Sequence, residues 1–73
     1  MIALSDKVSK ILNERNVSRR RLCMRTGIGR IFFYQNKWKK HHKYTVQAIA
    51  EYLGIPANEL VEGTNMEQYW EEE

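Results

Sequence analysis

The chain has 73 residues, of which 42% are hydrophobic, and it carries a formal net charge of +3. This length supports one domain with a small core, and no apolar run approaches the ~20 residues that a membrane-spanning helix needs. A single cysteine excludes an internal disulfide, so we expect a soluble protein of the reducing cytoplasm.

The first predicted helix covers residues 5–15. Val8 and Leu12 lie at helical spacing and belong to an inward apolar stripe. Ser5 can cap the first turn through its side-chain oxygen, and Asn16 can adopt the left-handed conformation that commonly ends a helix.

The next two predicted helices cover residues 19–26 and residues 29 to 38 or 39. Gly27 separates them, because it suits a left-handed helix end, and Ser18 is the candidate cap of the earlier helix. Arginines occupy positions 19–21, where they oppose the positive end of the helix dipole. A phosphate near this end would make the placement favourable.

The predicted third helix carries more apolar surface than it can bury. Only one of Phe32 and Phe33 can face the core fully, because neighbouring side chains on a helix point about 100° apart. Ile31, Tyr34 and Trp38 then leave apolar surface exposed to solvent or to a partner.

Two further helices are predicted over residues 43–53 and 57–61, with Gly54 ending the former. Residues 66–73 are expected either to fray or to form one helical turn. No segment has the alternation of a strand, so the predicted fold class is all-α.

Charge is distributed unevenly along the chain. Between Arg19 and Lys43 there are nine lysines and arginines and no acidic residue. Residues 1–63 form the predicted domain, and residues 64–73 form an acidic C-terminal tail. This asymmetry favours a surface that binds phosphates, and the alternative is a solvated basic face.

No pattern indicates an enzyme, a cofactor or a metal. The chain lacks a Gly-rich phosphate loop and a nucleophile–histidine arrangement with a scaffold able to bury it. Cys23 is expected to be a packed thiol, with a redox sensor as the alternative. His41 and His42 have no second ligand pair at zinc-site spacing. They are expected to be exposed in a loop, with weak pH tuning of the affinity of the basic surface for phosphates as the alternative.

Two blocks of sequence resemble a known family. One covers residues 11–18 (Ile-Leu-Asn-Glu-Arg-Asn-Val-Ser) and 22–28 (Leu-Cys-Met-Arg-Thr-Gly-Ile). The other covers residues 45–55 (Thr-Val-Gln-Ala-Ile-Ala-Glu-Tyr-Leu-Gly-Ile) and ends in Asn-Glu-Leu at 58–60. They resemble the Cro/CI-type, or XRE family, helix-turn-helix domain of phage and bacterial repressors. The resemblance implies a compact five-helix bundle of the lambda-repressor-like type, with the helix-turn-helix at the second and third helices.

Members of this family usually control transcription by binding operator DNA as dimers, with the third helix in the major groove. Carried onto this chain, the base-reading positions are Arg30, Ile31, Tyr34 and Gln35. The family's phosphate-contacting positions are Arg19, Lys39, Lys40 and Lys43, and we add Arg20 because backbone contacts are geometrically forgiving. Arg30 suits a bidentate pair with guanine, and its alternative role is a phosphate clamp without sequence preference.

The third helix departs from the family pattern at Gly29, Asn36 and Lys37, which replace a small polar cap, an apolar core residue and an acidic residue. A second hypothesis is therefore an antirepressor or modulator that binds another repressor through the aromatic face of this helix. Exposed aromatic side chains commonly anchor such interfaces. The candidate interface residues are Phe32, Trp38, Tyr69 and Trp70. In either role we expect no small-molecule ligand.

Overall fold

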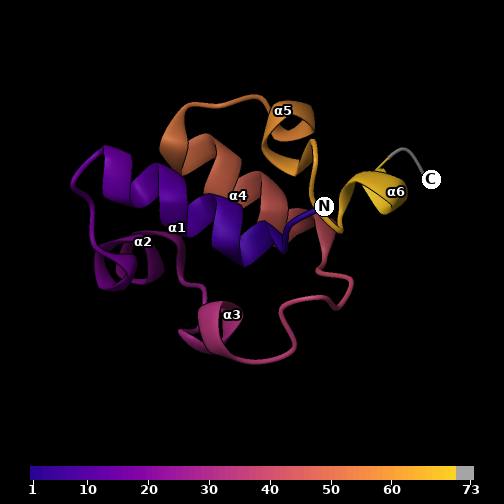
Figure 1. Ribbon diagram of the computed structural model, residues 1–73. Helices are drawn as coiled ribbons and strands as arrows, with labels where there is room; N and C mark the ends of the chain where they lie inside the picture. Colours follow the sequence, from indigo (N-terminus) through magenta and orange to yellow (C-terminus); the bar gives the residue numbers. More distant parts are fainter. Residues whose placement is uncertain (71–73) are drawn as a thin grey trace.

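The computed structural model describes residues 1–70, which form helices and a single isolated parallel bridge between Ile2 and Thr64. The predicted all-α class is therefore confirmed for this part of the chain. The helices are α1 (Leu4–Glu14), α2 (Arg19–Thr26), α3 (Ile31–Tyr34), α4 (Lys43–Leu53), α5 (Ala57–Val61) and α6 (Glu67–Trp70). Helix α4 packs against α2 and α5, while α1 packs against α3 and α5 (Figure 1).

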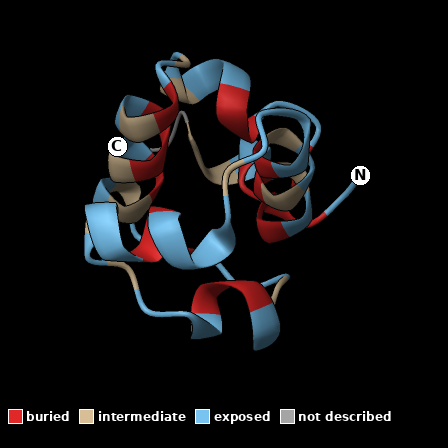
Figure 2. Cartoon of the chain, turned by 90° about the vertical axis from the view of Figure 1, so that its left-hand side faces the viewer, coloured by how far each residue is buried: buried red, intermediate tan, exposed pale blue. Residues whose placement is uncertain are grey.

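The core lies between α1, α2, α4 and α5. Helix α4 contributes Val46 and Ile49, which have no exposed surface, and these pack among Leu12, Leu22 and Leu60. Figure 2 shows the buried residues of the packed helices turned inward, including those of the short α3 at the bottom of the view. This inward stripe is what the apolar spacing of the first, second and fourth predicted helices indicated.

Turn chemistry sets most helix ends as predicted. Ser18 caps α2, and Gly27 and Gly54 end α2 and α4 in the left-handed conformation, with φ of 77° and 69°. Asn16 is also left-handed, with φ of 57°. The predicted bounds of α2 and α4 are confirmed, because these caps act locally. The predicted bounds of α5 are confirmed as well.

The start of α1 differs from the prediction. Ser5 does not cap the helix: α1 begins at Leu4, and the Ser5 side chain is buried with its Oγ unpaired in the structure. The Leu4 N–H instead donates to Asn65 Oδ1 at 2.9 Å. A residue from the far end of the chain therefore supplies the cap.

Helix α3 is a single turn, whereas a helix reaching residue 38 or 39 was predicted. Gln35 has an extended backbone, with φ of −125° and ψ of 138°, and Asn36 adopts a positive φ of 45°. Asparagine tolerates this left-handed conformation, which interrupts the helical hydrogen-bond pattern. The backbone then turns, with the Lys39 N–H donating to the Asn36 carbonyl. Residues 39–42 follow this turn and form the connector to α4.

Both phenylalanines of α3 are buried, which corrects the prediction that only one could be. Phe32 is 5% exposed and Phe33 is 3% exposed, and their rings meet edge to face at 5.0 Å. Helix α3 is covered on two sides, by α1 and by the connector residue His41. Two neighbouring side chains that point about 100° apart can therefore both be buried.

The core continues past residue 63, where the predicted domain ended and the acidic tail began. Thr64, Asn65 and Met66 are 1–3% exposed. The Asn65 side chain also donates from Nδ2 to the Lys39 carbonyl, so it joins α1 to the connector. Of the two alternatives predicted for residues 66–73, the helical turn is present as α6, and the tail glutamates 71–73 lie outside the described residues. No helix within residues 1–70 combines the length and apolar character needed to cross a bilayer.

Candidate nucleic-acid interface

The first turn of α2 presents three exposed arginines to solvent. Ser18 Oγ accepts a hydrogen bond from the Arg21 N–H at 3.0 Å, which fixes the helix start at Arg19. Arg19, Arg20 and Arg21 are exposed, and the first turn contains no acidic residue. Their charges therefore add to the positive end of the helix dipole, and this end favours an anion.

Arg19 connects α2 to α3. Its guanidinium donates to Tyr34 Oη at 3.4 Å and lies 5.5 Å from the centre of the Phe33 ring and 5.7 Å from that of Tyr34. Cation–π contacts of this kind contribute about 0.5–1 kcal/mol at exposed sites. The predicted phosphate ligand Arg19 and the predicted base reader Tyr34 thus belong to one surface.

Arg20 and Arg30 face a common hollow between α2 and the start of α3. They line a pocket of about 520 Å³ together with Met24 and Gly29. Arg30 is exposed, stands immediately before α3 and makes no side-chain cap hydrogen bond. The two guanidinium groups can therefore reach the same anionic ligand.

Helix α3 turns two apolar side chains outward. Ile31 is 58% exposed and Tyr34 is 62% exposed, while Phe32 and Phe33 hold the opposite side against the core. Gln35 is exposed too, but it follows the helix instead of lying on it as predicted. Of the predicted base readers, Arg30, Ile31 and Tyr34 thus lie at or within α3.

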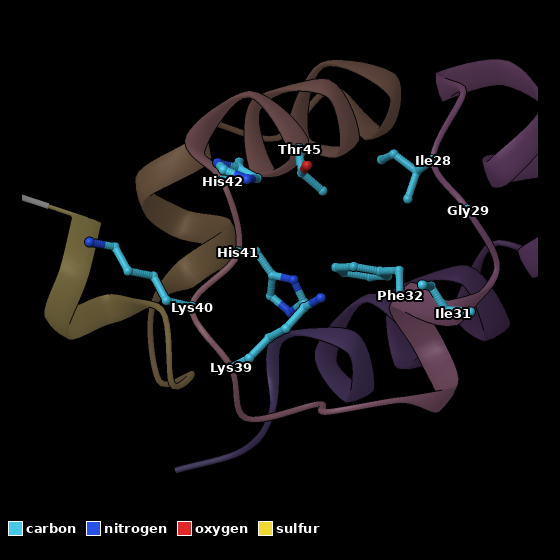
Figure 3. A pocket seen from close by; sticks show the side chains of 9 residues that line it. All are labelled: Ile28, Gly29, Ile31, Phe32, Lys39, Lys40, His41, His42 and Thr45. Atoms are coloured by element: carbon cyan, nitrogen blue, oxygen red, sulfur yellow. The ribbon is translucent and has the colours of Figure 1, made fainter.

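Lys39 and Lys40 lie across a pocket from α3. This pocket, of about 200 Å³, has Gly29, Ile31 and Phe32 on one side and the connector on the other (Figure 3). The structure thereby brings the connector lysines close to the turn before α3.

Lys40 and Lys43 also approach α6. Lys40 Nζ lies 5.0 Å from the centre of the Tyr69 ring, and Lys43 Nζ lies 5.5 Å from that of Trp70. The predicted phosphate ligands consequently form two groups: the α2 arginines beside α3, and the lysines beside α6, with Lys39 between them. Nothing local in the sequence indicates the contacts with α6, because they join distant segments.

His41 is not the exposed loop residue that was predicted. It is 6% exposed, and its ring centre lies 4.8 Å from that of Phe32. Its backbone N–H donates to Met66 Sδ at 3.2 Å. Figure 3 shows its imidazole pointing between Lys39 and Phe32. Burial lowers the pKa of His41, and the nearby Lys39 charge lowers it further. His42, by contrast, is exposed as predicted.

Cys23 is the packed thiol that the sequence predicted. It is 9% exposed, and burial raises the pKa of its thiol, with the neighbouring Arg30 acting in the opposite direction. The thiolate needed for redox chemistry is therefore disfavoured at neutral pH. Among residues 1–70, no three side chains of the metal-binding types group closely enough to hold an ion.

The candidate residues for a protein interface have different exposures. Phe32 is buried and cannot contact a partner directly, which corrects that prediction. Trp38 is 59% exposed, while Tyr69 and Trp70 are half-buried and pack against the core. Tyr44 was not predicted as a candidate residue, although it is 70% exposed and stacks on His42. Its only signal in the sequence is an imidazole and an aromatic side chain two positions apart.

Comparisons with known proteins identify no family for this chain. A scan against protein-family models, a search of curated proteins and a search of solved structures each returned no match. The function is therefore inferred from the residues and geometry described above.

Proposed function

We propose that the chain is a small, sequence-specific DNA-binding regulator of transcription that places α3 in the major groove of operator DNA. The observation that carries the proposal is the exposed cationic surface that α2 and the start of α3 share. Arg19 contacts Tyr34 across the two helices, and Arg20 meets Arg30 in one hollow. A cluster of arginines beside a short helix suits the closely spaced phosphates and base edges of a duplex.

The brevity of α3 limits which residues read bases. In helix-turn-helix proteins the N-terminal residues of the recognition helix contact base edges. Arg30 stands immediately before α3, and Ile31 and Tyr34 are the first and last residues of this single turn, so these three are the proposed base contacts. Gln35 follows the helix and would reach a base only from the extended backbone. Arg19, Arg20 and Lys39 are the proposed phosphate contacts nearest to α3, with Lys40 and Lys43 further along the connector.

A lambda-repressor-like, Cro/CI-type arrangement of the helices is part of this proposal. It is supported by the helices α1, α2, α4 and α5, each of which overlaps one of the two sequence blocks that resemble that family. It implies a cytoplasmic repressor-like protein of a phage or mobile element. A homodimer with two-fold symmetry would place two copies of α3 about 34 Å apart, one turn of DNA.

The proposal is tested by comparing two arginines that line one pocket. Duplexes selected from a random library define the preferred sequence, and fluorescence anisotropy then measures binding to that duplex and to a random one. Arg30→Ala should cost about 1–3 kcal/mol on the preferred duplex and much less on the random one, because a base contact is lost. Arg20→Ala, the matched control, should weaken both duplexes equally. Equal effects of the two substitutions would rule out base reading by Arg30, and no binding to any duplex at low salt would end the proposal.

A protein-binding role is the second candidate, because the α3 side of the molecule exposes apolar side chains. Ile31, Tyr34 and Trp38 are each 58–62% exposed. An antirepressor would use them as anchors for another repressor. Failure to bind duplex DNA, combined with binding to a purified repressor that Tyr34→Ala and Trp38→Ala abolish, would favour this candidate.

A further inference from the structure

The hollow between α2 and the start of α3 contains an exposed thioether. Met24 is 72% exposed and lines this hollow together with Arg20 and Arg30. Arg20 and Met24 stand four positions apart on α2, so their side chains are neighbours on one face of the helix. Arg30 reaches the same hollow from the position before α3. The sulfur of Met24 therefore belongs to the cationic surface that α2 and the start of α3 share.

The three methionines of the chain differ in how accessible they are to an oxidant. Met66 is 1% exposed, and its Sδ accepts a hydrogen bond from the backbone N–H of His41. Met1 is 81% exposed, but it precedes the first helix and does not line the hollow. Met24 is thus the methionine at which oxidation would alter the cationic surface.

The neighbouring thiol of Cys23 is a poorer target than this thioether. Cys23 is 9% exposed, and burial raises the pKa of its thiol, so the reactive thiolate is disfavoured. A thioether carries no proton, so the reactivity of the Met24 sulfur does not depend on an ionisation step. Exposure and protonation state both favour oxidation at Met24 over Cys23.

We propose that Met24 is an oxidation site whose sulfoxide binds the guanidinium groups of Arg20 and Arg30 and thereby weakens duplex binding. With hydrogen peroxide as the oxidant, the sulfur attacks one peroxide oxygen, so that an S–O bond forms and the O–O bond breaks. The sulfur loses two electrons, and the departing hydroxide takes the proton of the transferred oxygen and leaves as water. The product is a polar sulfoxide in place of an apolar thioether.

A sulfoxide at this position would compete with DNA for the same hydrogen-bond donors. Neither Arg20 nor Arg30 forms an ion pair with a carboxylate of residues 1–70, and no acidic side chain of that range lines the hollow. Their N–H groups can therefore donate to the sulfoxide oxygen, which lies one helical turn from Arg20. The effect on duplex binding rests on the proposed function, whereas the oxidation and the arginine contacts do not.

Mass spectrometry after brief treatment with dilute hydrogen peroxide tests the modification itself. Met24 and Met1 should gain oxygen well before Met66 in the folded protein, because Met66 is buried. In urea, where the chain is unfolded, the three residues should be oxidised at similar rates. Oxidation of Met24 no faster than that of Met66 in the folded protein would overturn the proposal.

Nuclear magnetic resonance tests the arginine contacts without DNA. The side-chain Nε–H signals of Arg20 and Arg30, assigned from Arg20→Lys and Arg30→Lys, should shift when the protein is oxidised. The signal of Arg15, which donates to the Leu53 carbonyl, is the internal control and should not move. In Met24→Leu the same treatment should leave all these signals in place. Unchanged Arg20 and Arg30 signals in the oxidised parent protein would overturn the proposal.

Fluorescence anisotropy tests the effect on the preferred duplex. Oxidation should weaken binding about three- to tenfold, because the sulfoxide occupies donors that the duplex would use. Met24→Leu is the matched control, since leucine has a similar volume and no sulfur. Compared with its own untreated sample, this variant should lose no affinity on treatment. A methionine sulfoxide reductase should restore binding by the oxidised parent protein.

Two results of this assay would overturn the regulatory effect: an unchanged affinity of the oxidised parent protein, or an equal loss in treated Met24→Leu. Failure of the untreated protein to bind any duplex would instead end the proposed function and this effect with it. The mass and arginine signals would still decide whether the sulfoxide forms and whether it contacts Arg20 and Arg30.

Discussion

Burial sets the protonation state of His41. The imidazole is 6% exposed, lies against the Phe32 ring, and its Nε2 finds no hydrogen-bond partner in the structure. Lys39 is the nearby cation, and Lys40 and Lys43 approach from the connector and the first turn of α4. A charged imidazole here would be desolvated and repelled, so the pKa of His41 is lowered in the folded protein.

We predict that protonation of His41 destabilises the fold. Below the ordinary histidine pKa of 6.5, the unfolded chain binds a proton that the folded chain resists, so stability should fall as the pH drops through 6.5 toward the lower pKa of the folded state. Above 6.5 both states are neutral at this residue, and its contribution should be flat. Thermal melting across this range should show a shallower pH dependence in His41→Leu than in the parent protein.

The exposed His42 provides the control for this prediction. His42→Leu removes an imidazole that stacks on Tyr44 at the surface, so it should leave the pH dependence of melting nearly intact. If His42→Leu flattened the pH dependence as much as His41→Leu does, burial of His41 would not be the cause.

At the level of the elements, Asn65 holds three segments together. Its Oδ1 accepts from the Leu4 N–H at the start of α1, and its Nδ2 donates to the Lys39 carbonyl in the connector. Its own N–H donates to the Ile2 carbonyl. The residue thereby caps one helix and fixes the path of the basic connector after α3.

We predict that Asn65→Ala costs about 1–3 kcal/mol, because a buried N–H and a carbonyl lose their partners. Urea denaturation monitored by circular dichroism would measure the change. Asn13→Ala, at an exposed position of α1, is the matched control and should stay within about 0.5 kcal/mol of the parent. Equal stabilities of the two variants would mean that the Asn65 side-chain bonds contribute nothing net.

Over the whole molecule, the proposed phosphate ligands form two groups, one on α2 beside α3 and one beside α6, with Lys39 between them. This division matters for the proposed DNA binding, because a duplex laid on α3 would meet the first group directly. Lys37, which lies between the groups in the sequence, pairs with Asp6 at 3.2 Å and is thus partly neutralised. Affinity for a duplex should therefore depend on particular basic residues and not on total charge.

Salt dependence tests this arrangement. If all five proposed phosphate ligands act, the log–log slope of affinity against salt should be about −4 to −5. Arg19→Ala should make the slope less negative by about one, because one phosphate contact is lost. Lys10→Ala removes the same charge from an exposed position of α1 and should leave the slope unchanged. Identical slopes for both variants would indicate a non-specific charge effect.

The sequence by itself determined the helical class and most helix limits. Ser18, Gly27 and Gly54 act through their own backbone and immediate neighbours, so the bounds of α2 and α4 followed from local chemistry. The exposed arginines of α2 could also be predicted, because a guanidinium group is rarely buried without a partner. At these positions, the local rules for helix ends and for exposed charges predict the conformation and the exposure that the folded protein has.

Only the tertiary structure decided the length of α3 and the surroundings of the connector. The helical run ends where the Gln35 backbone becomes extended, before the left-handed Asn36, and Phe32 is covered by His41 from beyond that turn. The contacts of Asn65 with Leu4 and of Tyr69 with Lys40 join segments that are distant in the sequence. Such contacts depend on how the helices pack, and helical periodicity carries no information about which distant segment will cover a given side chain.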